Sequence, residues 1–315
     1  MIRKKEPIKA YIINGFLESG KTEFIKYTLS QPYFQSKGKA LLIRCEEGEI
    51  SYEADFLKKY KVQLESIENE EDFTEATLIA FAEEHKPERI IIEYNGMWNH
   101  KGLSLPSAWE MEQQVTVIDT TTFGMYYNNM KSAVGEMVRN SDLILFNRAD
   151  GNEELTTYKR NIKIVNQQAD IIFEGKEAEI DAVLDEELPY DMQADVIEIT
   201  EETYGIWFLD ALDHTERYVG KTVSFLAQVL KRESFPGNYF VPIRVIMTCC
   251  MDDLAKLGFI CEYEDAKRLE DGDWVHVTAT VSQAFMQEYG SEGPVLHASI
   301  VTDACPPDSE ILEMN

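Results

Sequence analysis

The sequence predicts an α/β domain with a mostly parallel sheet, followed by a small, mainly-β domain of the OB-like barrel type. In the first half, short apolar segments alternate with longer amphipathic ones, which is typical of βαβ units with right-handed crossovers. In the second half, strand-length segments crowd into residues 221–302, a density typical of a small barrel. We place the first domain at residues 1–178, a linker at residues 179–195 and the second domain at residues 196–315.

The expected strands of the first half are nearly continuous apolar runs, as is usual when helices cover both faces of a sheet. These strands are Ala10–Asn14, Ala40–Arg44, Arg89–Glu93, Val115–Asp119, Leu143–Asn147 and Ile171–Phe173. The expected helices between them are Thr22–Leu29, Asp72–Glu84, Thr121–Val138 and Glu153–Val165.

The composition changes after Gly175. The acidic segment Lys176–Asp195 predicts a short helix and then a linker, and a further helix is expected near Thr203–Leu212. Polar residues alternate with apolar ones along Val275–Val281, which is the period of a half-buried strand. The expected strands are Lys221–Leu230, Tyr239–Cys249, Lys256–Cys261, Asp273–Val281 and Val295–Thr302.

The chain is strongly acidic, with a net charge of −27 in 315 residues. This charge repels phosphate backbones and anionic lipids, so nucleic acids and membrane surfaces are not expected partners. The charge suits cationic partners or metal ions, although solubility is the simpler explanation. No apolar run approaches the roughly 18 residues of a membrane span. The odd number of cysteines, 5, argues against a disulfide framework and predicts a cytoplasmic protein.

The most specific motif follows the first expected strand and opens the first expected helix. It reads Gly15-Phe16-Leu17-Glu18-Ser19-Gly20-Lys21-Thr22 and matches the pattern G-x-x-x-x-G-K-[ST]. Its glycines let backbone N–H groups turn toward phosphates, and the helix N-terminus adds its positive end. Lys21 is expected to reach the β- and γ-phosphates, and the Thr22 hydroxyl is expected to bind Mg²⁺. The motif therefore predicts a nucleoside triphosphate site.

Further nucleotide-site elements follow in order along the chain. Glu93 ends an expected strand, where its carboxylate can hold Mg²⁺ through water while the Gly96 N–H faces a γ-phosphate. The strand Leu143–Asn147 leads into Asn147-Arg148-Ala149-Asp150. A carboxylate at Asp150 can accept hydrogen bonds from guanine N1–H and N2–H, donors that adenine does not present.

These motifs resemble those of the CobW-type metallochaperone GTPases over residues 8–175. The matching segments are Gly15–Thr22, Cys45–Glu49, Glu93–Gly96, Val115–Asp119 and Asn147–Asp150. The resemblance implies GTP binding and hydrolysis coupled to delivery of a metal ion, often zinc or cobalt. It also implies that acidic residues of the Cys45–Glu49 segment approach Mg²⁺, so we take Glu46 and Glu49 with Lys21 as catalytic candidates.

The sequence departs from that family at several positions. The family usually carries a C-x-C-C metal motif, but the corresponding interval, Ser51–Pro87, contains no cysteine. Glu18 replaces a loop glycine and places a carboxylate where phosphates approach. Arg148 replaces a lysine that packs along the base, which leaves an ATP-dependent protein as an open alternative, and Cys45 replaces an asparagine.

The second half resembles a poorly characterised bacterial domain that occurs in a protein partnered with a predicted membrane permease. The match covers about residues 196–305, and its distinctive part is a C-C-x-x-D motif that begins at Cys249 and Cys250. Together with the following Asp252 and Asp253, and with Cys305 or His297 as a further ligand, these thiols would suit a soft metal such as Zn²⁺. A structural role for the cysteines is the competing interpretation.

We therefore expect a Mg²⁺-dependent GTPase of low turnover that acts in metal-ion handling or as the accessory of a permease. Its expected ligands are GTP and Mg²⁺, with Zn²⁺ in addition. The expected partners are a metal-dependent client protein or a permease subunit, and a homodimer is a further option. The rival hypothesis is a non-catalytic nucleotide-binding adaptor whose G-domain is degenerate.

Overall fold

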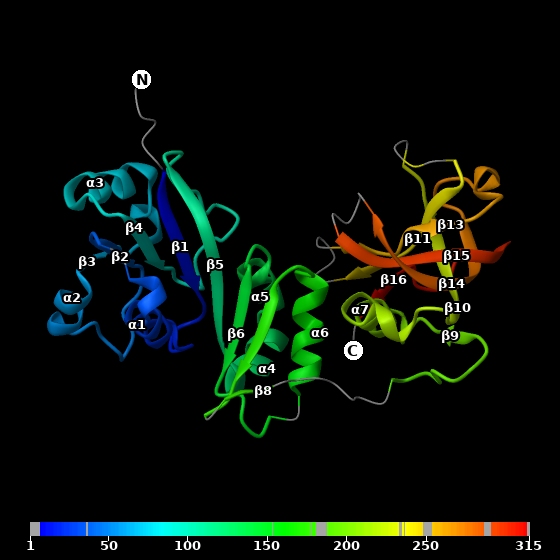
Figure 1. Cartoon of the computed structure of the whole chain (residues 1–315), viewed down its shortest axis with the longest axis horizontal. Coiled ribbons are helices and arrows are strands. Elements are labelled where there is room, and N and C mark those ends of the chain that lie inside the picture. The colour runs from blue at the N-terminus through cyan, green and yellow to red at the C-terminus, as the bar shows by residue number, and fades with distance from the viewer. Residues whose placement is uncertain are drawn as a thin grey trace. The chain divides into compact units, whose positions relative to one another are not determined.

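The computed structural model describes residues 7–35, 37–152, 154–176, 178–180, 188–232, 235, 237–247, 254–286 and 291–313. The chain divides into two compact units, Met1–Val183 and Leu184–Asn315, which are described separately (Figure 1).

Unit 1 is built on an eight-stranded sheet in the order β3-β2-β4-β1-β5-β6-β7-β8. Neighbouring strands pair in parallel, except that β8 runs antiparallel to β7. The strands are β1 (Ile8–Asn14), β2 (Ala40–Arg44), β3 (Val62–Ser66), β4 (Arg89–Glu93), β5 (Trp109–Asp119), β6 (Leu143–Asn147), β7 (Asp170–Glu174) and β8 (Glu179–Ile180).

Helices cover both faces of this sheet, because successive strand residues point to opposite sides. Ile13 and its neighbours pack with α1 and α2, while Ile12 and its neighbours pack with α3. A third apolar cluster joins α4, α5 and α6 to β6 and β7. The helices are α1 (Lys21–Ser30), α2 (Ala54–Tyr60), α3 (Glu75–His85), α4 (Thr120–Asn129), α5 (Lys131–Val138) and α6 (Leu155–Val165), with short 3-10 turns at Pro32–Phe34 and Glu70–Asp72.

Some elements of unit 1 differ from the expectation. Neither α2 nor β3 was predicted, because both are short and about half polar. The single helix expected at Thr121–Val138 is two helices, because Met130 leaves helical geometry at φ −138° and ψ 41°. Of the segment after Gly175 where a short helix was expected, residues 181–187 lie outside the described residues; in the described part, Glu179–Ile180 forms a strand and residues 188–195 contain no helix.

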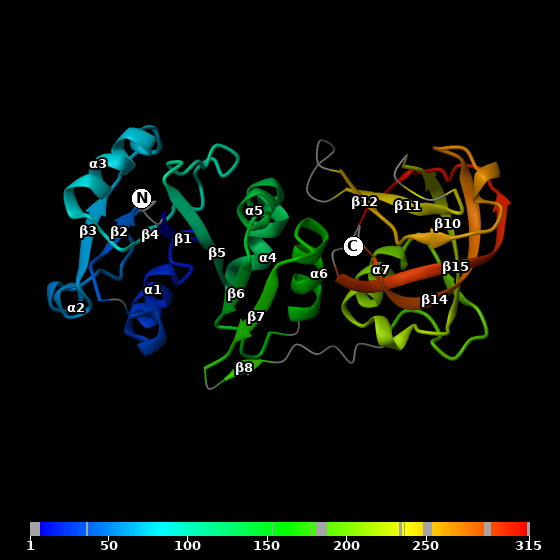
Figure 2. The ribbon, with the colours of Figure 1, turned by 45° about the horizontal axis from the view of Figure 1, so that its top comes forward.

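Unit 2 is mainly β, with strand order β12-β11-β13-β15-β14-β10-β9 and a further pairing of β11 with β16. Pairing of β10 with β11 partly closes this path into a ring of strands (Figure 2). The elements are β9 (Ile197–Ile199), α7 (Tyr204–Asp213), β10 (Thr222–Leu230), β11 (Tyr239–Met247), β12 (Leu254–Leu257), β13 (Cys261–Glu262), β14 (Trp274–Met286), β15 (Ser291–Asp303) and β16 (Ile311–Glu313), with 3-10 turns at Thr215–Arg217 and Ala266–Arg268.

The core of unit 2 is aromatic. Trp207 of α7 is fully buried and its ring packs against Phe225 and Phe259. The strand expected at Lys256–Cys261 is two short strands, β12 and β13, which both pair antiparallel with β11, and residues 258–260 between them belong to no strand. The predicted fold class, a mostly parallel α/β sheet followed by a mainly-β unit, is confirmed. Within the described ranges, no helix has the length and apolar character to cross a lipid bilayer.

Candidate nucleotide-binding site

The loop between β1 and α1 has the backbone geometry that its glycines permit. Gly15 has φ +146° and Gly20 has φ +98°, backbone angles that residues other than glycine rarely adopt. A Cβ added at Gly15 would lie 2.2 Å from the Val117 carbonyl oxygen, so the loop also needs glycine there for space. Gly20 is the N-cap of α1, and the loop therefore ends at a helix N-terminus with its free N–H groups.

Lys21 extends back across this loop and is only 4% exposed. Its ammonium donates hydrogen bonds of 2.8 Å to the carbonyl oxygens of Gly15 and Phe16. The same ammonium forms an ion pair with the Glu46 carboxylate. The expected phosphate-binding lysine thus lies over the loop, where its charge is shared between loop carbonyls and a carboxylate of the segment after β2.

Thr22 and Glu93 meet as the sequence predicted. The Thr22 hydroxyl donates to Glu93 Oε1 at 2.6 Å, and the Tyr52 hydroxyl donates to Glu93 Oε2 at 2.8 Å. Burial raises the pKa of Glu93, and hydrogen bonds from Thr22 and Tyr52 oppose that rise. The site thus offers buried oxygen ligands beside the phosphate loop, the ligand type that Mg²⁺ prefers. Tyr52 was not predicted, since no motif marks it.

Gly96 lies directly against the loop. Its N–H donates to the Gly15 carbonyl oxygen at 3.1 Å, and a Cβ added at Gly96 would lie 2.5 Å from the same oxygen. In this structure the Gly96 N–H, which we expected to face a γ-phosphate, is therefore bonded to the loop.

The Asn147–Asp150 segment is tied to the phosphate loop by side chains. Asn147 Nδ2 donates to the Ser19 carbonyl oxygen at 2.6 Å. Arg148 donates to the Glu18 carbonyl oxygen at 3.2 Å and forms an ion pair with Asp119. Although burial acts in the opposite direction, hydrogen bonds from Thr121 and Arg148 lower the pKa of Asp119. Arg148 therefore braces the loop, a role that its motif position did not predict.

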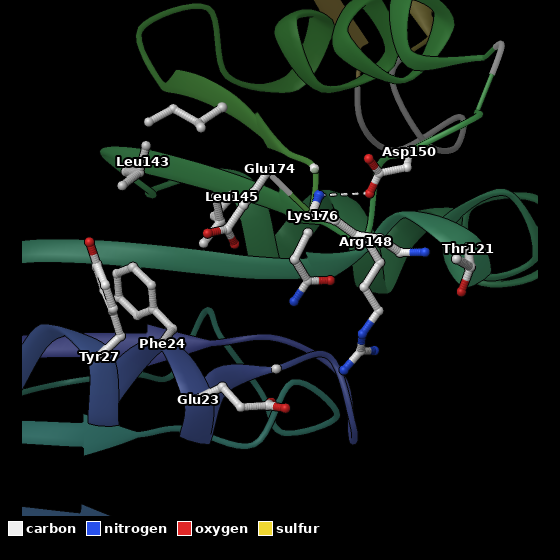
Figure 3. Close-up of a pocket in the computed structure, with 14 residues that line it drawn as sticks. Glu23, Phe24, Tyr27, Thr121, Leu143, Leu145, Arg148, Asp150, Glu174 and Lys176 are labelled. Carbon is white, nitrogen blue, oxygen red and sulfur yellow. Dashed lines mark hydrogen bonds between the residues drawn. The ribbon is translucent and has the colours of Figure 1, made fainter. Parts of the chain in front are cut away.

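Asp150 stands at one end of a groove of about 720 Å³ (Figure 3). Its Oδ2 atom accepts a 2.8 Å hydrogen bond from the Lys176 backbone N–H, which fixes the carboxylate at the groove mouth. Figure 3 shows Phe24 and Tyr27 of α1 facing Leu143 and Leu145 of β6 at the other end. The groove therefore combines a polar end beside the phosphate loop with apolar walls, which is the usual composition of a small-molecule site.

The structure brings most predicted residues to one edge of the sheet. Glu18 Oε1 accepts a 2.8 Å hydrogen bond from the Glu49 N–H, which joins the loop to the segment after β2. Cys305 is exposed, whereas Cys249 and Cys250 lie outside the described residues. Across the part of the chain that the structure describes, no group of three or more His, Cys, Asp or Glu side chains is arranged to hold a metal.

The fold and the site together define a P-loop nucleotide-binding α/β domain: a glycine loop lies between β1 and α1 with a lysine over it, and the Asn147–Asp150 segment at the end of β6 is tied to that loop. The chain belongs to the CobW/HypB/UreG nucleotide-binding domain family, whose model matches residues 9–173, just over half of the chain. Residues 175–311 match the DUF1980 C-terminal domain. Both resemblances noted in the sequence are thereby confirmed.

Similar solved structures are distant. Zn(II)-bound YjiA GTPase from E. coli is 20% identical over 56% of this chain and 60% of its own, with a TM-score of 0.42. The hydrogenase maturation factor HypB from Archaeoglobus fulgidus is 18% identical over 53% of this chain and 80% of its own, with a TM-score of 0.39. The chain thus spans about 60% of the length of YjiA. No curated protein matches the sequence significantly.

Proposed function

We propose that this protein binds GTP with Mg²⁺ and hydrolyses it slowly, as a nucleotide-dependent switch in metal-ion handling. The observation that carries the proposal is the meeting of Lys21, Thr22, Glu93 and Asp150 at one edge of the unit 1 sheet, on the loops that follow parallel strands. Ligands of open α/β sheets bind at this edge.

Guanine is the base that the groove favours. The Asp150 carboxylate is an acceptor, and guanine presents N1–H and N2–H donors where adenine presents an acceptor and C–H. Asp150 is exposed in this structure, so a bound base would have to cover it; an acceptor covered in this way and left unpaired by the wrong base disfavours that base. Arg148 is held by Asp119 and the Glu18 carbonyl, so it does not depend on the base for its position.

Thr22 and Glu93 fit a magnesium ion, because both offer oxygen atoms. Glu93 is buried and its contact with Thr22 is partly buried, so bulk water has limited access to these ligands. Bound there, Mg²⁺ would neutralise charge on the transferring phosphoryl group. Lys21 and the loop N–H groups would orient the β- and γ-phosphates. Glu46 or Glu49 would orient water or add to the metal shell, so these residues supply positioning rather than covalent chemistry.

The metal-handling role rests on family membership, and the metal-binding step is assigned to the second half. The cysteine pair Cys249-Cys250, with Cys305, is the soft-metal candidate for Zn²⁺. A metal-dependent client or a permease subunit would receive the signal of the nucleotide state.

The test of the base assignment is competition between GTP and ATP for the wild-type protein, Lys21→Ala and Asp150→Asn, each with Mg²⁺. We expect GTP-selective binding, loss of binding in Lys21→Ala, and loss of guanine preference in Asp150→Asn. Equal affinity for GTP and ATP in the wild type would overturn the guanine assignment. Binding that survives in Lys21→Ala would remove the loop from the site.

A non-catalytic adaptor is the second candidate, and one observation favours it. The Glu18 and Glu46 carboxylates lie at the phosphate loop, where they oppose a triphosphate. GTP binding without measurable phosphate release, even with Mg²⁺ and Zn²⁺ present, would support the adaptor over the GTPase.

A further inference from the structure

The phosphate end of the site is closed by carboxylates of the chain itself. The hollow lined by Lys21, Thr22, Glu46 and Glu93 has a volume of about 20 Å³. A cavity needs roughly 10–15 Å³ for one water, so this hollow has room for about one water and none for a phosphate group. The base groove beside it, at about 720 Å³, is open.

Glu46 occupies the position of an anion on Lys21. The ammonium has three donors, and the carbonyl oxygens of Gly15 and Phe16 accept hydrogen bonds from it at 2.8 Å. The Glu46 carboxylate is the charged partner of the same ammonium, in an ion pair with side-chain exposures of 4% for Lys21 and 11% for Glu46. Because both charges are largely removed from water, a phosphate that takes the ammonium must release Glu46.

Glu18 fastens the same segment from the other side. Glu18 has φ +59°, and its Oε1 atom accepts the Glu49 N–H at 2.8 Å. A Cβ added at Gly48 would lie 2.8 Å from that oxygen, so the carboxylate lies closely against the segment backbone. The segment Cys45–Ile50 is thus held to the loop at Glu46 and again at Glu49.

We propose that Glu46 is a built-in substitute for phosphate, which keeps the loop closed until a nucleotide displaces it, and that Glu18 is the latch that holds the Cys45–Ile50 segment in the closed position. This regulation rests on the proposed nucleotide binding at Lys21. Opening releases Glu46 and the Glu49 N–H together, so the segment reports whether phosphate is bound.

Glu46→Gln tests the substitute, with Glu47→Gln as its matched control. The control removes the same charge one residue away, from a side chain that is 76% exposed. Titration with fluorescent GTP and Mg²⁺ should give about tenfold or more tighter binding for Glu46→Gln, because the variant loses the largely buried ion pair with Lys21 in the closed state. Glu47→Gln should change the affinity less than about twofold, as expected for an exposed ion pair.

The latch is tested by Glu18→Gln against Glu18→Ala. Both variants remove the charge, but glutamine keeps an oxygen acceptor for the Glu49 N–H and alanine does not. Hydrogen exchange of the Glu49 amide without nucleotide should be faster in Glu18→Ala than in Glu18→Gln. Adding GTP to the wild type should speed the same amide. Equal exchange in the two variants would overturn the latch.

The outcomes separate this inference from the proposed function. If the wild type binds GTP and Glu46→Gln binds no tighter than Glu47→Gln, the substitute role is refuted and GTP binding stands. If Glu46→Gln binds GTP and the wild type does not, the substitute role is supported, whereas GTP binding by the wild-type protein is refuted. If neither the wild type nor Glu46→Gln binds GTP or ATP while circular dichroism shows that both are folded, the proposed function and the substitute role fail together.

Discussion

Replacing Gly96 with alanine should disturb both the stability of unit 1 and its phosphate loop. The added Cβ would lie 2.5 Å from the Gly15 carbonyl oxygen, 2.6 Å from the Gly15 carbonyl carbon and 2.9 Å from the Phe16 nitrogen. All three are backbone atoms of the phosphate loop, so they cannot move away from the added methyl group by a side-chain rotation. Forcing an extra methyl group into a packed position costs about 1–3 kcal/mol.

The size of the effect follows from these contacts. A loss of about 2 kcal/mol lowers Tm by about 4–8 °C in a domain of this size. The Gly15 carbonyl oxygen also accepts a hydrogen bond from Lys21 at 2.8 Å, so its displacement should weaken GTP binding by about tenfold. Thermal unfolding by circular dichroism and titration with fluorescent GTP measure the two effects.

Gly102→Ala is the matched control. Gly102 is exposed, and its added Cβ would come closest to the flexible Asn99 side chain, with Nδ2 at 3.2 Å, while the Asn99 carbonyl oxygen lies at an ordinary contact distance of 3.8 Å. This variant should keep wild-type Tm within about 2 °C, because surface substitutions stay within about 0.5 kcal/mol. If Gly96→Ala matches Gly102→Ala in both Tm and GTP affinity, the close approach of Gly96 to the loop is not as described.

Two further predictions concern buried polar groups. Burial raises the pKa of Glu93, so the folded state favours its protonated form. Glu93→Gln should therefore raise Tm at pH 7 without ligands. This gain in Tm should vanish as the pH falls toward 4.5, the ordinary pKa of a glutamate. The same variant should weaken Mg²⁺-dependent GTP binding about tenfold or more. A gain in Tm that persists at pH 4.5 would contradict the raised pKa of Glu93. Tyr218 is fully buried and hydrogen-bonds at 2.6 Å to both Asp210 and Tyr190, so Tyr218→Phe should destabilise unit 2 by about 1–3 kcal/mol in urea unfolding, whereas an unchanged midpoint would refute that network.

Much of the fold could be predicted because its signals are local. The strands Ala40–Arg44, Arg89–Glu93 and Leu143–Asn147 begin and end where the sequence predicts, since each is an apolar run between polar turns. The edge strand Val62–Ser66 was not predicted, because a strand at the edge of a sheet need not be apolar throughout its length. The helix Ala54–Tyr60 has seven residues, too few for a clear 3.6-residue period.

Part of the candidate site could also be predicted from the sequence, and part of it could not. Thr22 and Glu93 could be paired from sequence, because Thr22 opens the helix after β1 and Glu93 ends β4, and these two strands are neighbours in a parallel sheet. Tyr52 reaches Glu93 from a segment without regular structure, so only the tertiary fold places it there. The pairing of Arg148 with Asp119 likewise joins the ends of β6 and β5 through side chains, and residue type alone does not specify which carboxylate an arginine takes.

The acidity of the chain gives the closed phosphate end a thermodynamic consequence. With 57 acidic against 30 basic residues, the protein repels a free triphosphate before contact, and Glu46 and Glu18 add to that repulsion at the loop. The groove beside Asp150 is open, so under the proposed function guanine contacts there would form before the phosphates reach Lys21. A divalent cation that travels with the nucleotide would cancel part of the repulsion and would then be held by Thr22 and Glu93. In this scheme the base would supply recognition, while the cation and the displacement of Glu46 together would determine when the loop opens.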